Sequence, residues 1–230
     1  MGGQTVMQAR VRYALAAVVM LASAGSAQNA GAPGSTGKPM RTFRDAELPL
    51  TFSYPAELQP RAAGTPQAGG NSCSKTLLVA GIGQDPNEES ATSSGAAQAG
   101  SARWASLTLT DTGCVPPRVL KKTKVLDEML SGMTSGPTET LGLMPMEQPI
   151  GYLLEGRHAF LAAAQGEPVS SSDVQPANGA EVLAVVAVSV KDHILLWRMA
   201  SNDPNLLNEM LASRVDFGTG AQALYPGHIG

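Results

Sequence analysis

The stretch that most constrains the fold runs from Glu181 to Phe217 and carries the densest hydrophobic sequence of the chain. Its first part, 182–190, is apolar at every even position and apolar or small at the odd positions, which predicts a strand covered on both faces. A second run of β-forming residues follows at 194–199, after a charged break. The two runs predict an antiparallel hairpin, and the charges between them favour this over one membrane-spanning helix.

A helix is predicted directly after this hairpin. Asp203 offers a side-chain oxygen for the N-cap position, and Pro204 suits the first helical position because its missing N–H costs nothing there. Apolar residues then recur at helical spacing, and the hairpin supplies a sheet for them to pack on. They are Leu206, Leu207, Met210 and Leu211. Arg214 is expected near the C-terminal end of this helix, where its charge complements the helix dipole.

The first residues of the chain have the pattern of a secretory signal peptide. Arg10 and Arg12 precede an apolar or small run at 13–24, and small residues at 25–27 form a cleavage site. A helix that anchors the protein is the alternative, but this run is about a dozen residues and a span needs about 20. We therefore expect cleavage after residue 27, a secreted or periplasmic location, and no membrane span in the mature chain.

The charge of the mature chain narrows the choice of partner. Removal of residues 1–27 takes away two arginines and no acidic residue, so the formal net charge goes from −3 to −5. The one basic cluster, at 121–124, is interpreted as the solvated start of a helix, and it is not interleaved with aromatic residues. These features argue against nucleic acid as a partner.

Two cysteines, Cys73 and Cys114, are expected to form a disulfide bond, because export places them in an oxidising compartment. The bond would close a loop of roughly 40 residues and stabilise the fold by about 4 kcal/mol on the chain-entropy model. A metal site would need more ligands at short spacing, and a redox pair is usually spaced Cys-x-x-Cys.

Composition and pattern divide the mature chain into a disordered leader (28–39), a single domain (40–217) and a loose C-terminal tail (218–230), in which Leu224 and Tyr225 could provide a local anchor. The domain is predicted to be α+β, an antiparallel sheet with helices packed on it. Polar insertions at 85–101 and 167–179 are expected to be surface loops. The other predicted elements are strands around Phe43 and at 48–54, 76–82, 104–110, 138–143, 150–154 and 158–164, and a helix at 119–133 that ends at Gly136 and Pro137.

The order of these elements resembles the PsbP-like superfamily. The resemblance is carried by Phe52-Ser53-Tyr54-Pro55, the central helix, the hairpin turn at Gly156, and the terminal helix that closes on 213–217. That superfamily includes the extrinsic photosystem protein PsbP and DcrB-type periplasmic lipoproteins. The resemblance implies an α/β sandwich with roles in assembly or binding. No position matches a ligand or metal motif of the family, and the long loops and the cysteines depart from its pattern.

Short catalytic motifs are incomplete or in the wrong setting. Ser72 and Lys75 match the Ser-x-x-Lys motif of penicillin-recognising enzymes, but they enter a predicted strand rather than a helix. Gly81-Ile82-Gly83 lacks the third glycine of a dinucleotide loop and is interpreted as a turn. The segment 132–136 has threonine where a nucleophile elbow needs serine and is interpreted as a helix terminus.

The three histidines lack the spacing of a metal site. His158 is placed at a strand start, His193 in a solvated turn and His228 in the loose tail, while Asp127 and Glu128 are assigned to a solvated helix face. We therefore predict no catalytic, metal or cofactor-binding residues and no cofactor. The expected function is that of a non-catalytic binding or assembly domain of the cell envelope with a protein or other envelope partner. A secreted enzyme, hydrolase-like, is the alternative.

Overall fold

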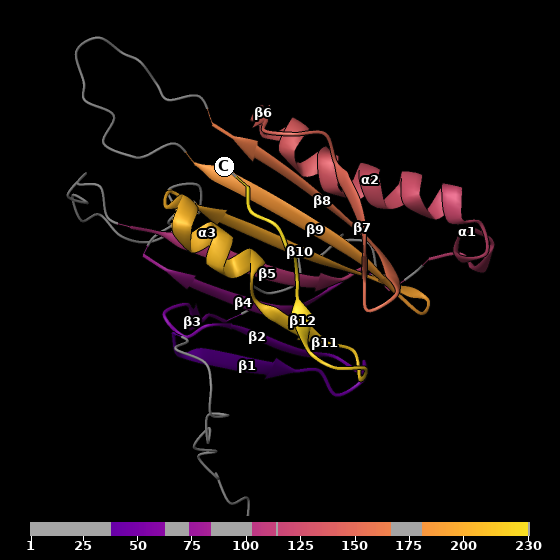
Figure 1. Cartoon of the computed structure of the whole chain (residues 1–230), viewed down its shortest axis with the longest axis horizontal. Helices are drawn as coiled ribbons and strands as arrows, with labels where there is room; N and C mark the ends of the chain where they lie inside the picture. Colours follow the sequence, from indigo (N-terminus) through magenta and orange to yellow (C-terminus); the bar gives the residue numbers. More distant parts are fainter. Residues whose placement is uncertain (1–37, 63–73, 84–102, 114, 167–180, 230) are drawn as a thin grey trace, which may run out of the picture. The chain divides into compact units, whose positions relative to one another are not determined.

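The computed structural model describes residues 38–62, 74–83, 103–113, 115–166 and 181–229. The chain divides into two units, Met1–Gly37 and Lys38–Gly230, and every described residue belongs to the second. This unit has the predicted α+β fold, in which helices pack on antiparallel sheets (Figure 1).

Several sequence predictions lie outside the described residues. These are the signal peptide at 1–27, the leader at 28–39 except for its last two residues, the Cys73 to Cys114 bond and the polar insertions at 85–101 and 167–179. Within the described ranges, no helix has both the length and the apolar character needed to cross a membrane.

An eight-stranded antiparallel sheet forms the centre of the unit. Its strands are β3 (Gln59–Pro60), β4 (Lys75–Ile82), β5 (Ala105–Asp111), β6 (Met144–Pro145), β7 (Ile150–Leu154), β8 (Arg157–Gln165), β9 (Val182–Val190) and β10 (His193–Ser201). They lie in the order β3-β4-β5-β10-β9-β8-β6, and β7 pairs with β8 outside this path. The predicted hairpin is confirmed as β9 and β10, joined by a two-residue turn in which Lys191 has a φ of 55°.

A smaller, four-stranded sheet brings the two ends of the unit together. Its strands are β1 (Met40–Arg44), β2 (Thr51–Pro55), β11 (Arg214–Asp216) and β12 (Gln222–Ala223), in that order. Phe52 is the partner of Phe43 on one side and of Val215 on the other, so these three side chains share the face that meets the core.

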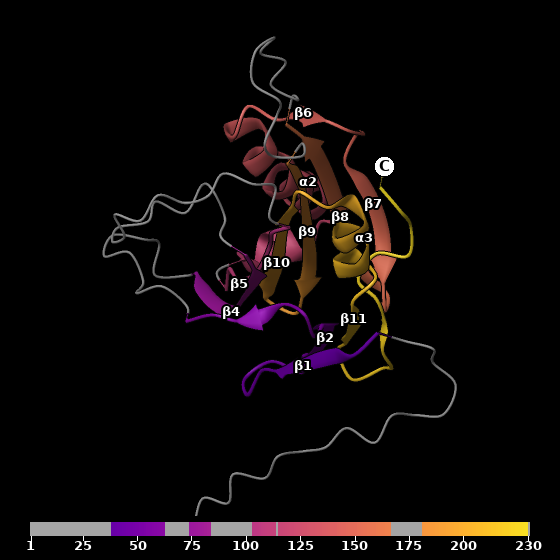
Figure 2. The same ribbon diagram turned by 90° about the vertical axis from the view of Figure 1, so that its left-hand side faces the viewer.

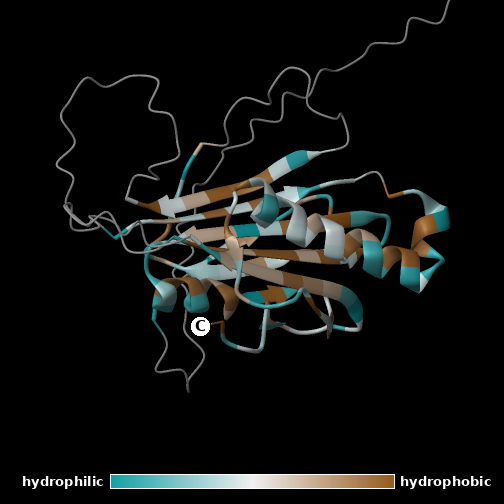
Figure 3. Ribbon diagram, turned by 90° about the horizontal axis from the view of Figure 1, so that it is seen from above, coloured by the Kyte–Doolittle hydropathy of each residue, from teal (hydrophilic) through white to brown (hydrophobic). Residues whose placement is uncertain are grey.

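The main core lies between the large sheet on one side and the small sheet with the last helix on the other. Trp197 of β10 is fully buried there, with its ring centroid 5.8 Å from that of Phe52. On β9 the even-numbered residues face this core, and nearly all of the odd-numbered ones are buried on the opposite face, as the sequence predicts. Figure 3 accordingly shows the strands of the large sheet mainly in the colours of hydrophobic residues.

The helix predicted at 119–133 is in fact two helices and extends further. α1 (Pro117–Leu120) is short, and α2 (Thr123–Thr140) continues through Gly136 and Pro137. The predicted helix end and the strand predicted at 138–143 are therefore wrong.

Packing on the large sheet accounts for the longer helix. Pro137 has no N–H to give to the carbonyl oxygen of Met133 one turn earlier. The hydroxyls of Ser135 and Thr138 donate to the carbonyl oxygens of Ser131 (2.8 Å) and Ser135 (2.6 Å), so they do not replace this bond. Thr134 and Thr138 on either side of the proline are buried, and α2 packs along β8 and β9, so tertiary contacts hold the helix past the proline.

The last helix, α3 (Pro204–Leu211), begins where the sequence indicates. Asp203 occupies the N-cap position, and its Oδ1 accepts hydrogen bonds from the backbone N–H groups of Asn205 (2.9 Å) and Leu206 (3.4 Å). The whole predicted apolar stripe is buried. α2 and α3 lie on opposite faces of the large sheet (Figures 1 and 2). Arg214 does not flank the helix end as predicted, because it lies in β11 and donates to the carbonyl oxygen of Ala221 (3.0 Å).

The prediction of a loose C-terminal tail is also wrong for the described part of 218–230. Leu224 is fully buried, and Asn208 of α3 bonds both the N–H and the carbonyl oxygen of Ile229 (3.0 and 2.9 Å). Tyr152 of β7 donates its hydroxyl to the carbonyl oxygen of Leu224 (2.7 Å). Burial raises the pKa of Tyr152 above its usual value, so this hydroxyl keeps its proton and stays a donor.

The carboxylate of Glu155 fixes the start of this segment. Its side chain has no exposed surface and accepts hydrogen bonds from the backbone N–H of Phe217 (3.2 Å) and from the hydroxyl of Thr219. Glu155 and Gly156 both have positive φ, 48° and 74°, as expected for a tight two-residue hairpin turn. The predicted turn between β7 and β8 thus also holds the C-terminal strands.

Candidate binding face

The described residues cover one side of the large sheet only in part. α2 packs over β8 and β9, and α1 reaches the end of β10 where His193 lies. Trp104 and Leu143 cover the opposite end. Between these covers, outward-facing residues of β4, β5 and β10 remain partly or fully accessible. This surface, termed the open face, comprises Val79, Ser106, Thr108, Thr110, Leu196 and Arg198.

Strand alternation explains which side chains point outward here. In β10, Trp197 and Met199 are buried in the main core, so Arg198 between them has to point to the other side of the sheet. In β5, Leu107 and Leu109 are buried in the same core. The polar residues that alternate with them therefore line the open face.

The pairing of the strands fixes the geometry of the face. Thr108 lies directly opposite Arg198, and Val185 of β9 lies opposite Arg198 on its other side. Ser106 and Thr110 are each two residues from Thr108 along β5, a separation of about 6.8 Å on one face of a strand. Three hydroxyl groups thus form a row beside one guanidinium group.

These polar groups have no side-chain partner within the described part of the chain. Arg198 is exposed, and neither its guanidinium nor the hydroxyls of Ser106, Thr108 and Thr110 make a hydrogen bond or ion pair there. Arg103 differs, because two carboxylates hold its guanidinium. The open face therefore presents free donors on a rigid sheet, and an arginine in this setting can bind a carboxylate or phosphate through two parallel hydrogen bonds.

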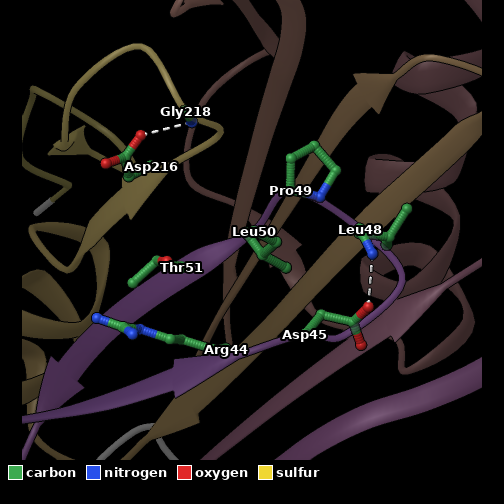
Figure 4. A pocket seen from close by; sticks show the side chains of 8 residues that line it. All are labelled: Arg44, Asp45, Leu48, Pro49, Leu50, Thr51, Asp216 and Gly218. Atoms are coloured by element: carbon green, nitrogen blue, oxygen red, sulfur yellow. Dashed lines mark hydrogen bonds between the residues drawn. The ribbon is translucent and has the colours of Figure 1, made fainter.

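A hollow of about 250 Å³ lies elsewhere, between the β1–β2 turn and β11 (Figure 4). The carboxylates of this hollow accept hydrogen bonds from backbone N–H groups. Asp45 Oδ1 accepts from the N–H groups of Glu47 and Leu48 (both 2.8 Å), and Asp216 Oδ1 accepts from those of Gly218 (2.6 Å) and Gly220. The bonds from Gly218 and then Gly220 hold the pKa of Asp216 below its usual value. Both aspartates thus act as turn-forming anions in this hollow.

A second hollow, of about 300 Å³, lies between α2 and the segment before β7. Its lining includes Ser135 and Thr138, whose hydroxyls already donate to helix carbonyls, and the exposed carboxylates of Glu139 and Glu147. No nucleophile and base meet among these side chains, so the hollow has no catalytic geometry.

Two histidines have carboxylate neighbours that the sequence did not predict. His158 Nδ1 lies 2.9 Å from Asp127 Oδ1, close enough for an ion pair although that oxygen makes no well-directed hydrogen bond. Asp127 therefore faces β8, and its assignment to a solvated face is wrong. His193 is half-buried rather than solvated, with Nδ1 3.0 Å from Asp111 and Nε2 3.4 Å from Asp192.

The remaining motif residues lie apart from one another and from these histidines. Lys75 is in β4 and bonds Glu47 (3.2 Å), while Ser72 lies outside the described residues. Gly81 belongs to β4, and the segment 132–136 is in the middle of α2 rather than at a helix terminus. Within the described ranges, no group of three or more His, Cys, Asp or Glu side chains is placed to hold a metal ion.

Comparison of the chain with protein-family models and with curated proteins gave no match.

Arg198 belongs to no sequence motif. One signal could have found it, because it is the only charged residue in the run 193–201, whose other members are apolar or small apart from His193. A charge in the middle of an otherwise buried strand marks the place where one side of that strand is uncovered.

Proposed function

We propose that this chain is an exported binding domain of the cell envelope, without turnover of its own, that binds a partner through the open face. The observation that carries the proposal is the unengaged row of Arg198, Thr108 and its neighbouring hydroxyls on the middle strands of the sheet. The backbone that carries these donors is already held in the sheet, so a ligand need not order it on binding. The signal-peptide pattern and the resemblance to the PsbP-like superfamily support the same proposal.

Site-specific photocrosslinking in the producing cells tests this function. A photoreactive amino acid replaces Thr108 on the open face or, as a control, exposed Thr42 on β1 of the small sheet. We expect a discrete crosslinked protein from position 108 and none from position 42. Equal crosslinking at both positions, or none at 108, would contradict binding through the open face.

A hydrolase-like enzyme is the alternative, and the observation that favours it is the contact of His193 with Asp111 (3.0 Å). A histidine held by a carboxylate can act as a general base. The purified mature chain would be screened for hydrolysis beside His193→Ala and His158→Ala. Turnover that is lost in a folded His193→Ala variant would establish the enzyme class and refute the binding domain.

A further inference from the structure

We infer that the ligand of the open face is an extended, acidic segment of a partner protein, and that Arg198 binds a carboxylate of this segment. The inference rests on the proposed function, because it names the ligand class of the same face.

The charge of the face points to an anionic group. Arg198 is the one charged residue of the open face, and it brings an unpaired positive charge to the middle of the sheet. The nearest carboxylate along β5, Asp111, is already in contact with His193 and with the N–H of Gly113 (2.9 Å). Arg198 is exposed in the free chain, and a bound segment that covers it would exclude water and so strengthen the ion pair.

The spacing of the face points to an extended peptide. Ser106, Thr108 and Thr110 repeat at about 6.8 Å, which is also the repeat of alternate side chains in an extended chain. A peptide lying along β5 can therefore place every second residue against one of these hydroxyls. Val79 and Leu196 flank the row and offer apolar contact, which suits peptide side chains better than a phosphate group.

The small number of positive charges on the open face argues against a polyanion as its ligand. Binding to nucleic acid or to an anionic membrane depends on several lysines or arginines that neutralise charges together. The open face has a single arginine, and the chain has a formal net charge of −3. One carboxylate in an otherwise neutral peptide matches one arginine.

The test uses short Thr/Val peptides with one central Glu, or Gln in its place, and follows binding to the ¹⁵N-labelled chain by NMR. We expect the Glu peptide to shift the resonances of Arg198 and Thr108, and to bind roughly tenfold more weakly to Arg198→Gln, as for loss of one charge-assisted hydrogen bond. The Gln peptide should bind the native chain about as weakly as the Glu peptide binds Arg198→Gln. Added salt should weaken the binding of the Glu peptide only. Arg44→Gln is the matched control, since Arg44 is an exposed strand arginine on the small sheet.

Other outcomes overturn the inference. The inference is refuted if the Glu and Gln peptides bind equally well, or if Arg198→Gln keeps the native affinity for the Glu peptide. It is also refuted if the affinity falls in Arg44→Gln instead. Preferential binding of inorganic phosphate, a single-stranded oligonucleotide or anionic vesicles at Arg198 would likewise overturn it. Crosslinking from position 108 that persists in Arg198→Gln would leave the binding function intact and refute only the acidic ligand, which separates the two proposals.

Discussion

Removal of the Asp203 carboxylate should destabilise the fold through two separable contributions. One oxygen caps α3, and the other accepts a hydrogen bond from Arg103 Nε (2.7 Å), whose guanidinium also binds Glu57 (2.7 Å). Loss of an N-cap costs about 1 kcal/mol. The ion pair is partly exposed and contributes about 0.5 kcal/mol. Asp203→Ala should therefore lose about 1.5 kcal/mol, and Asp203→Asn only about 0.5 kcal/mol because asparagine caps equally well.

Urea unfolding followed by tryptophan fluorescence measures this difference. Trp104 and Trp197 are 4 % and 0 % exposed, so both report the loss of the core. With a denaturant slope of about 2 kcal/mol/M, the midpoint should fall by about 0.7 M for Asp203→Ala. Glu128→Gln, which removes a carboxylate from an exposed pair on α2, is the control and should change little. An unchanged midpoint for Asp203→Ala, or an equal loss for Asn and Ala, would refute the reasoning.

The pH dependence provides a second check. Burial alone would raise the pKa of Asp203, but the bonds from Arg103, Leu206 and Asn205 outweigh it and hold the pKa below its usual value. A carboxylate with a lowered folded pKa stabilises fully above its unfolded pKa of about 3.9 and loses this effect as the pH falls through the folded value. The native chain should thus have a higher free energy of unfolding than Asp203→Asn, by an amount that is constant near neutral pH and shrinks below about pH 4. A constant difference down to lower pH would contradict the ion pair.

Three further predictions concern the contacts of the C-terminal segment and the two cysteines. Glu155→Ala should cost about 2–3 kcal/mol and speed hydrogen exchange at the Phe217 amide, because it leaves that buried N–H without its acceptor; unchanged exchange would argue against this anchor. Tyr152→Phe should lower stability by about 1 kcal/mol in the same urea assay through loss of one hydrogen bond, and no loss would mean that water replaces it. Non-reducing peptide mapping of exported material should find Cys73 joined to Cys114, whereas two free thiols would refute the bond.

The sequence predicted best the elements whose signals are local. The hairpin of β9 and β10 was readable because each strand has its own alternation, and α3 because Asp203 and Pro204 mark its start independently of the rest of the chain. The strands predicted at 76–82 and 104–110 are confirmed as β4 and β5, which pair with Lys75 opposite Asp111. In these stretches local preference and the final packing agree, so pattern alone was sufficient.

The errors arose where distant contacts override local preference. Pro137 predicts a helix end by propensity, but the packing of α2 on β8 keeps the helix intact. The tail has no pattern of its own, and it is ordered by Tyr152 of β7, Glu155 of the turn after β7 and Asn208 of α3. No periodicity within the tail could have indicated these partners.

The open face, too, depends on contacts that the local sequence pattern does not indicate. Thr108 and Arg198 are ordinary strand residues in the sequence, and they are far apart along the chain. They become a binding candidate only because α2 covers β8 and β9 and leaves β5 and β10 accessible on that side. The position of a covering helix depends on the packing of the whole sheet. A site of this kind therefore depends on the order of the strands, and no motif in the sequence indicates it.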